Sequence, residues 1–408
     1  MPLLRWHTLG VVLVLAVLLA GLFAAWLPAP ANRSLVAGDN KPGADVRGKQ
    51  VASADWPLFR GNPLQTGVAT SGLPEKLEVL WQFKTGDAIE GTAAIVDGVV
   101  YIGSLDERLY AIDLATGKQK WKYKAGPIKA AIAARDGAVY VGNLDGVFHC
   151  VDAAKGTKRW TYKVESEADI PSGANFVGDS VLFGCGDEHL YCLSSDGKLR
   201  WKFKVPGGPV NASPGVVGDR TFVAGCDSSL HMIDTKNGKE LAAVDLGGQV
   251  GAPVGIKGDR LYVGTMTNQV LAIDWQKADI VWKFEPRRAR AFYAGVAVTD
   301  DFVIAGSKNK RVYAVDRKKG TEVWSFPTDG DVDSSPVVVG KRVFVGSHDG
   351  NLYALDLNMG TLIQKLPLGG RIIGSPAVGG NCLIISATVP QPDNKPDIGV
   401  VYCFGAKK

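Results

Sequence analysis

The sequence predicts an all-β fold, an eight-bladed β-propeller of four-stranded antiparallel blades. A segment of about forty residues recurs along the chain, most clearly at residues 98–126 and 342–360. Each copy contains four short apolar or alternating runs separated by Gly and Asp turns, a pattern typical of an antiparallel blade. Because no single unit can bury its own apolar face, the copies must stack against one another.

Counting the copies gives the number of blades. Seven complete units begin near residues 92, 130, 172, 212, 252, 294 and 334. An eighth begins at Gly374 and supplies only three strands before the chain ends. The missing fourth strand is expected in residues 77–86, which carry Trp81 at the position of the other fourth-strand tryptophans. Pairing this first strand with the last blade closes the ring over residues 55–408 and removes an open sheet edge.

The amino terminus is a separate element. An apolar run from Leu9 to Leu27 follows Arg5, and its length of about nineteen residues approaches that of a membrane-spanning helix. Residues 29–31 also have the small-x-small form of a signal-peptide cleavage site. We therefore expect residues 1–31 to form a signal anchor, with a cleaved signal peptide as the alternative. Residues 32–54 read as a flexible linker, and the propeller is expected outside the cytoplasm, in the periplasm or outside the cell.

Tryptophan recurs on the fourth strand of most units. An indole on the outermost strand needs a slot between neighbouring blades, and a small residue on the third strand makes room for it. That third-strand position holds mainly Ala or Cys, so three of the six cysteines are interpreted as small buried apolar residues. Blades four and seven depart from the pattern, with Ala242 and Gln364 in place of the indole. The tryptophans predicted to dock are Trp81, Trp121, Trp160, Trp201, Trp282 and Trp324.

Two strings carry a family resemblance. The string Ala111-Ile112-Asp113, Thr116-Gly117, Trp121 resembles the tryptophan-docking motif of the pyrroloquinoline-quinone (PQQ) repeat family. Residues 55–62 (DWPLFRGN) resemble the lead-in of its secreted members, which include BamB-like outer-membrane assembly factors. The resemblance covers residues 55–408. It implies a propeller that acts in cell-envelope protein assembly, with a protein partner and no catalytic role.

PQQ-dependent dehydrogenases of this family offer an enzymatic alternative. They resemble this chain in fold but carry an adjacent pair of cysteines and a Ca²⁺ ion beside the quinone. The present sequence has no adjacent cysteines. We therefore expect no enzyme, no cofactor and no metal, and rank the dehydrogenase below a propeller that binds a small ligand.

Several polar residues look functional in isolation. Cys185, Asp187, His189 and Cys192 resemble a metal-binding hairpin, but the repeat gives each a routine place at a strand end, a turn or the small-residue slot. Aspartates after the second strands are explained by turn chemistry. Three residues that precede first strands could line one mouth of the channel, or could be solvated loop residues. These are Glu90, Asn211 and Asp333.

Two surface features point to a partner. The outer strands of blades one to three are rich in lysine, which either prevents sheet pairing or forms a basic belt for anionic partners. The loop before blade six carries Arg287, Arg288, Arg290, Phe292 and Tyr293, and we regard it as the best candidate contact site, with solvated loop charge as the alternative. The net charge of +5 does not favour nucleic acid. We expect a monomeric propeller, held to the membrane by its amino-terminal helix, that serves as an interaction platform. On the outer strands of blades one to three, the lysines predicted to face outward are Lys120, Lys122, Lys124, Lys163, Lys202 and Lys204.

Overall fold

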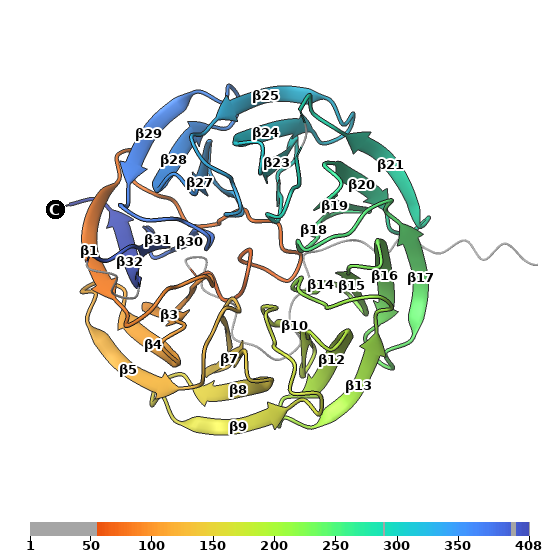
Figure 1. Ribbon diagram of the computed structural model, residues 1–408, viewed down its shortest axis with the longest axis horizontal. Coiled ribbons are helices and arrows are strands. Elements are labelled where there is room, and N and C mark those ends of the chain that lie inside the picture. The colour runs from red at the N-terminus through yellow and green to blue at the C-terminus, as the bar shows by residue number, and fades with distance from the viewer. Residues whose placement is uncertain (1–54, 289, 393–396, 408) are drawn as a thin grey trace, which may run out of the picture. The chain divides into compact units, whose positions relative to one another are not determined.

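Eight four-stranded antiparallel sheets form a ring in the computed structural model, which describes residues 55–407 except 289 and 393–396 (Figure 1). The eight-bladed, all-β prediction is confirmed. The predicted amino-terminal helix over 1–31 and the linker over 32–54 lie outside the described residues. Within the described part of the chain, no helix has the length and apolar character to cross a membrane.

The first four blades follow one another along the chain. Blade one consists of β2 (Ala94–Val96), β3 (Val99–Gly103), β4 (Arg108–Asp113) and β5 (Gln119–Lys124). Blade two consists of β6 (Ala133–Arg135), β7 (Ala138–Gly142), β8 (Val147–Asp152) and β9 (Lys158–Lys163). Blade three consists of β10 (Asn175–Val177), β11 (Ser180–Gly184), β12 (His189–Ser194) and β13 (Leu199–Lys204). Blade four consists of β14 (Gly215–Val217), β15 (Arg220–Ala224), β16 (Ser229–Asp234) and β17 (Glu240–Asp245).

The remaining blades repeat the same order until the ring closes. Blade five consists of β18 (Gly255–Lys257), β19 (Arg260–Gly264), β20 (Val270–Asp274) and β21 (Asp279–Phe284). Blade six consists of β22 (Ala297–Val298), β23 (Phe302–Ser307), β24 (Arg311–Asp316) and β25 (Glu322–Pro327). Blade seven consists of β26 (Val337–Val339), β27 (Arg342–Gly346), β28 (Asn351–Asp356) and β29 (Leu362–Pro367). Blade eight consists of β30 (Ala377–Gly379), β31 (Cys382–Val389), β32 (Ile398–Gly405) and β1 (Glu78–Lys84).

The ring closes through blade eight, as the sequence predicts. Strand β1 pairs antiparallel with β32, and Trp81 lies opposite Cys403. In Figure 1 the orange β1 therefore lies outside the blue strands from the other end of the chain. This pairing removes the open edge that β32 would otherwise present.

The docking tryptophans join each blade to the next. Each indole lies directly across the sheet from a small residue, as Trp121 does from Ala111. Its Nε1 donates to a backbone carbonyl of the following blade, and the ring covers a turn glycine there; Trp81, for example, covers Gly117. The bonds are Trp81 to Leu114, Trp121 to Ala153, Trp160 to Ser195, Trp201 to Thr235, Trp282 to Arg317 and Trp324 to Leu357, all at 2.8–3.1 Å.

The two blades that lack this indole have substitutes. Gln364 of blade seven donates from Nε2 to the Leu77 carbonyl at 2.8 Å and accepts from the Leu77 amide at 3.1 Å. Blade eight has no turn at this point, because its fourth strand comes from the other end of the chain. A side-chain amide that bonds an extended backbone segment suits this junction better than an indole. At the blade four junction Ala242 packs in one cluster with Trp275 and Ala278, so an indole from blade five takes part in filling the space.

Residues 55–69, which we call the leader, bond to the innermost strands of the blades. Backbone carbonyls of the leader accept from the second residue of the first strand in blades one, two, four, five, six and seven. In blade three, Asn175 donates from Nδ2 to the Pro63 carbonyl. In Figure 1 the orange leader crosses the middle of the ring. The amide donors are Ile95, Ala134, Val216, Ile256, Val298 and Val338, and their acceptors are Trp56, Pro57, Pro63, Leu64, Thr66 and Gly67.

The leader therefore holds seven blades together through the first, innermost strand of each. Every one of these amides would otherwise be an unpaired donor on an inner sheet edge. Sequence reasoning identified residues 55–62 only as a lead-in and missed this role.

Candidate functional site

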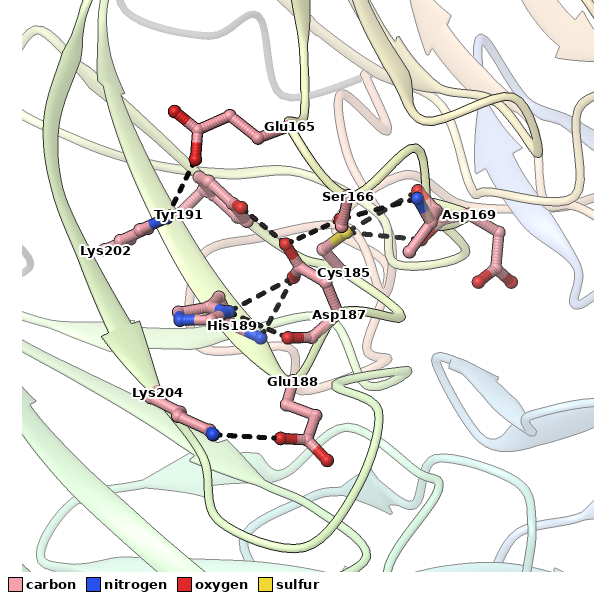
Figure 2. Close-up of polar contacts among 11 residues, drawn as sticks. Glu165, Ser166, Asp169, Cys185, Asp187, Glu188, His189, Tyr191, Lys202 and Lys204 are labelled. Carbon is pink, nitrogen blue, oxygen red and sulfur yellow. Dashed lines mark hydrogen bonds and ion pairs between the residues drawn. The ribbon is translucent and has the colours of Figure 1, made fainter.

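The cysteine, aspartate and histidine hairpin of blade three is held by local hydrogen bonds (Figure 2). Asp187 accepts from Tyr191 Oη at 2.6 Å and from Ser166 Oγ at 3.0 Å. His189 Nδ1 lies 2.8 Å from the Asp187 carbonyl. Cys185 Sγ lies 3.4 Å from the carbonyl of Asp169. Within the described residues, no cluster of His, Cys, Asp and Glu is arranged to hold a metal ion.

The electrostatics of this hairpin suit a structural role. Burial raises the pKa of the Cys185 thiol to about 12, so the sulfur is a protonated thiol at neutral pH. Burial also opposes ionisation of Asp187, but hydrogen bonds from Tyr191 and its neighbours outweigh burial and hold the pKa of Asp187 below its usual value. The pair of Asp187 and Tyr191 recurs as Asp106–Tyr110 and Asp349–Tyr353. In these three blades the turn aspartate therefore fixes the tyrosine ring four residues later.

The three residues expected near a channel mouth are mostly paired with neighbours. Glu90 forms an ion pair with Lys129 at 3.1 Å. Asp333 lies 3.2 Å from His348 Nε2 and 3.7 Å from Lys308 Nζ. Asn211 is exposed. Each of the two carboxylates thus lies beside a lysine ammonium group, Glu90 beside Lys129 and Asp333 beside Lys308.

Most of the outer-strand lysines are also paired locally. Lys124 lies 3.4 Å from Glu107, Lys202 lies 3.7 Å from Glu165 and Lys204 lies 3.4 Å from Glu188. Lys163 lies 2.5 Å from Glu167. These side chains are exposed, so each pair contributes little to stability. The paired carboxylates do reduce the positive potential of this face.

The loop between β21 and β22 carries a different kind of positive charge. The side chains of Arg287, Arg288 and Arg290 are exposed, and none forms an ion pair or hydrogen bond within the described part of the chain. The backbone beside them is fixed, because Ser307 Oγ donates to the Arg290 carbonyl at 3.0 Å. Lys308 donates from its backbone amide to Ala291 at 3.0 Å. Three guanidinium groups are thus presented from an anchored loop.

The two aromatic residues of this loop have opposite roles. Tyr293 is 41% exposed, and the Lys308 ammonium lies 4.2 Å from its ring centroid. Phe292 is fully buried and packs against Tyr313 with ring centroids 6.1 Å apart. The prediction that Phe292 contacts a partner is therefore wrong. Its amide bonds Thr265 of blade five, which turns the side chain into the core.

Comparison with known proteins gives the chain a family context. The profile described as outer membrane protein assembly factor BamB matches residues 74–194, 145–241 and 279–364, which together make up more than half of the chain. Quinoprotein glucose dehydrogenase of Escherichia coli (strain K12) is 32% identical over 132 residues, which are 27% of this chain and 16% of that protein. The chain thus corresponds to a small part of that relative's length.

Solved structures share the fold at low sequence identity. BamB from Moraxella catarrhalis matches with a TM-score of 0.67 at 19% identity, covering 81% of this chain and 98% of that one. A europium-containing methanol dehydrogenase matches with a TM-score of 0.72 at 15% identity, covering 87% and 98%. Quinohemoprotein alcohol dehydrogenase from Comamonas testosteroni matches with a TM-score of 0.74 at 14% identity, covering 88% and 82%. At these identities the likeness concerns the fold alone.

Proposed function

The chain belongs to the family of the outer membrane protein assembly factor BamB, and from this premise we propose that it is a non-catalytic platform for protein partners in the cell envelope. Its propeller would lie outside the cytoplasm, tethered by its amino-terminal segment. The observation that carries the proposal is the exposed arginine loop before blade six.

The loop has the chemistry of a contact site for a carboxylate-bearing protein segment. A guanidinium group can donate two parallel hydrogen bonds to one carboxylate, which gives orientation as well as affinity. Arginine and tyrosine are also enriched among the residues that dominate binding energy at protein interfaces. Arg287, Arg288 and Arg290 have no intramolecular acid to displace among the described residues, whereas the outer-strand lysines named above do.

A second candidate function is a quinoprotein dehydrogenase, which the similarity to the Escherichia coli enzyme raises. The donor set needed to hold Ca²⁺ beside a quinone does not fit the described residues. Glu90 and Asp333 are already paired with lysine side chains, Lys129 and Lys308, and no metal-binding cluster of carboxylates, histidines or cysteines occurs in the described ranges. Turnover of alcohol or sugar with added PQQ, Ca²⁺ and an artificial electron acceptor would contradict the platform proposal.

The experiment that tests the platform is a partner-recovery assay from native membranes after crosslinking. The triple variant R287E/R288E/R290E should recover an acidic partner at least about tenfold less than the unaltered protein, since losing one charged hydrogen bond costs about 1.5–3 kcal/mol. The matched control K118E/K120E/K122E changes the net charge equally, at two lysines on the outer strand β5 of blade one and at Lys118 immediately before it. Equal loss in both triples would mean that net charge, and not this loop, determines binding.

A further inference from the structure

The leader carries a buried cation with an incomplete set of partners. The Arg60 side chain is only 1% exposed, and its Nη2 donates to the Val296 carbonyl at 2.7 Å. Its Nε and Nη1 atoms are buried and have no hydrogen-bond partner among the described residues. No described carboxylate forms an ion pair with it. Val296 immediately precedes β22, the innermost strand of blade six, so the guanidinium lies inside the ring.

A charge in such a position needs compensation. Burying an unpaired ion is strongly unfavourable, and a buried side chain escapes the penalty only by losing its proton or by gaining a counter-charge. Burial lowers the pKa of Arg60 to about 9, which still leaves the group charged at neutral pH. Proton loss therefore does not remove the charge.

The chain around Arg60 is shaped to seat the guanidinium. A Cβ atom on Gly67, whose φ is +65°, would lie 2.0 Å from Arg60 Nη2, so a side chain at that position would displace the guanidinium. Arg60 and Gln65 have φ values of +64° and +54°, a left-handed conformation that such residues rarely adopt. The Gly67 amide closes the loop by bonding the Arg60 carbonyl at 3.0 Å. Gln65 donates from Nε2 to Ser213 and Pro214, which anchors the loop to blade four.

We propose that the leader binds one small monovalent anion, a halide ion or a carboxylate group, on Nε and Nη1 of Arg60. Trp56 Nε1 is also a buried donor without a partner among the described residues, in the part of the leader that bonds blade one. Gln65 Oε1, by contrast, is an unpaired acceptor that suits a water molecule and not the anion. Water alone would hydrate Arg60 but would leave its charge uncompensated. The anion neutralises the cation that closes the leader on the ring, so its binding stabilises the closed leader. This site is independent of the proposed partner surface.

Amide hydrogen exchange of the full chain tests the site. The amides of Ile95, Ala134, Val216, Ile256, Val298 and Val338 donate to the leader, so their exchange reports its opening. Exchange would be measured in sodium chloride, sodium acetate and sodium gluconate at constant ionic strength; gluconate serves as the bulky anion. Above the dissociation constant, one-site linkage lowers the opening constant about tenfold for each tenfold rise in the free concentration of the anion that binds. Protection by chloride or by acetate supports the site and identifies the halide or the carboxylate as its ligand.

A second arginine provides the matched control. Arg342 also holds the chain near the leader, through the carbonyls of Leu73, Pro74 and Glu75. R60M should abolish the anion dependence, whereas R342M should keep it. Crystals of the unaltered protein, one form grown in bromide and one in acetate, provide a readout that does not depend on a variant folding. An anomalous peak at Arg60, or acetate density there, supports the proposal. Equal exchange in all three salts, or only water at Arg60 in both crystal forms, would overturn it.

Discussion

Substitution of Gly117 tests the tryptophan dock that closes the ring. A Cβ atom at Gly117 would lie 2.6 Å from Cγ of Trp81, whereas carbon atoms in contact are about 3.5 Å apart, so the ring must retreat by about 1 Å. The 2.8 Å bond from Trp81 Nε1 to the Leu114 carbonyl cannot survive that movement. Gly98 of the same blade provides the control, because its φ of +72° matches the +71° of Gly117 and no atom lies within 4 Å of an added Cβ.

The magnitudes follow from this difference. G98A should cost only the left-handed penalty of about 1–2 kcal/mol. G117A should cost about 2 kcal/mol more, from the lost hydrogen bond and the lost packing of the indole. Urea unfolding of both variants measures the difference. In a W81A background the extra cost of G117A should disappear, because the collision partner is gone. Equal destabilisation by G98A and G117A in the unaltered protein would refute the docking argument.

Three further outcomes follow from individual contacts. Q364A should lower the free energy of unfolding by about 2–4 kcal/mol, because it leaves the amide and carbonyl of buried Leu77 unpaired; Q82A, on the exposed side of β1, should cost less than about 0.5 kcal/mol. Burial lowers the pKa of His149 to about 4, so between pH 6.5 and pH 4 the unfolded chain binds a proton on this histidine that the folded protein does not bind. The free energy of unfolding should therefore fall by up to about 3 kcal/mol over this range. H149Q should remove that pH dependence, and an unchanged dependence in H149Q would assign it to other groups. Because burial raises the pKa of Cys185 to about 12, Ellman's reagent at pH 8 should modify Cys185 only in urea, and rapid native labelling would contradict its burial.

The repeat allowed the fold to be predicted, because every blade repeats the same apolar alternation and the same turns. The three-strand eighth unit and the position of Trp81 together indicated how the ring closes, and the pairing of Trp81 opposite Cys403 confirms that prediction. Departures from the repeat were harder to interpret. Gln364 makes sense only when Leu77, far away in the sequence, is seen beside it.

The leader and Phe292 show where sequence reasoning stopped. The leader bonds through backbone carbonyls, and their acceptor role leaves no pattern in side-chain identity. A signal did exist in Arg60, Gly61 and Gly67, since an arginine followed by two glycines in a short apolar segment is unusual on a solvated loop. Phe292 appeared exposed because it sits among arginines. It is buried because the backbone pairing with Thr265 decides which way the side chain points.

The most direct test of the platform is site-specific photocrosslinking in native membranes. A photoreactive phenylalanine analogue would replace Tyr293 beside the arginine loop or Leu199 on the outer strand of blade three, whose side chains are 41% and 43% exposed. The account predicts a discrete protein adduct from position 293, lost in R287E/R288E/R290E, and none from position 199. Equal crosslinking from both positions, or an adduct at 293 that survives the charge reversal, would contradict it.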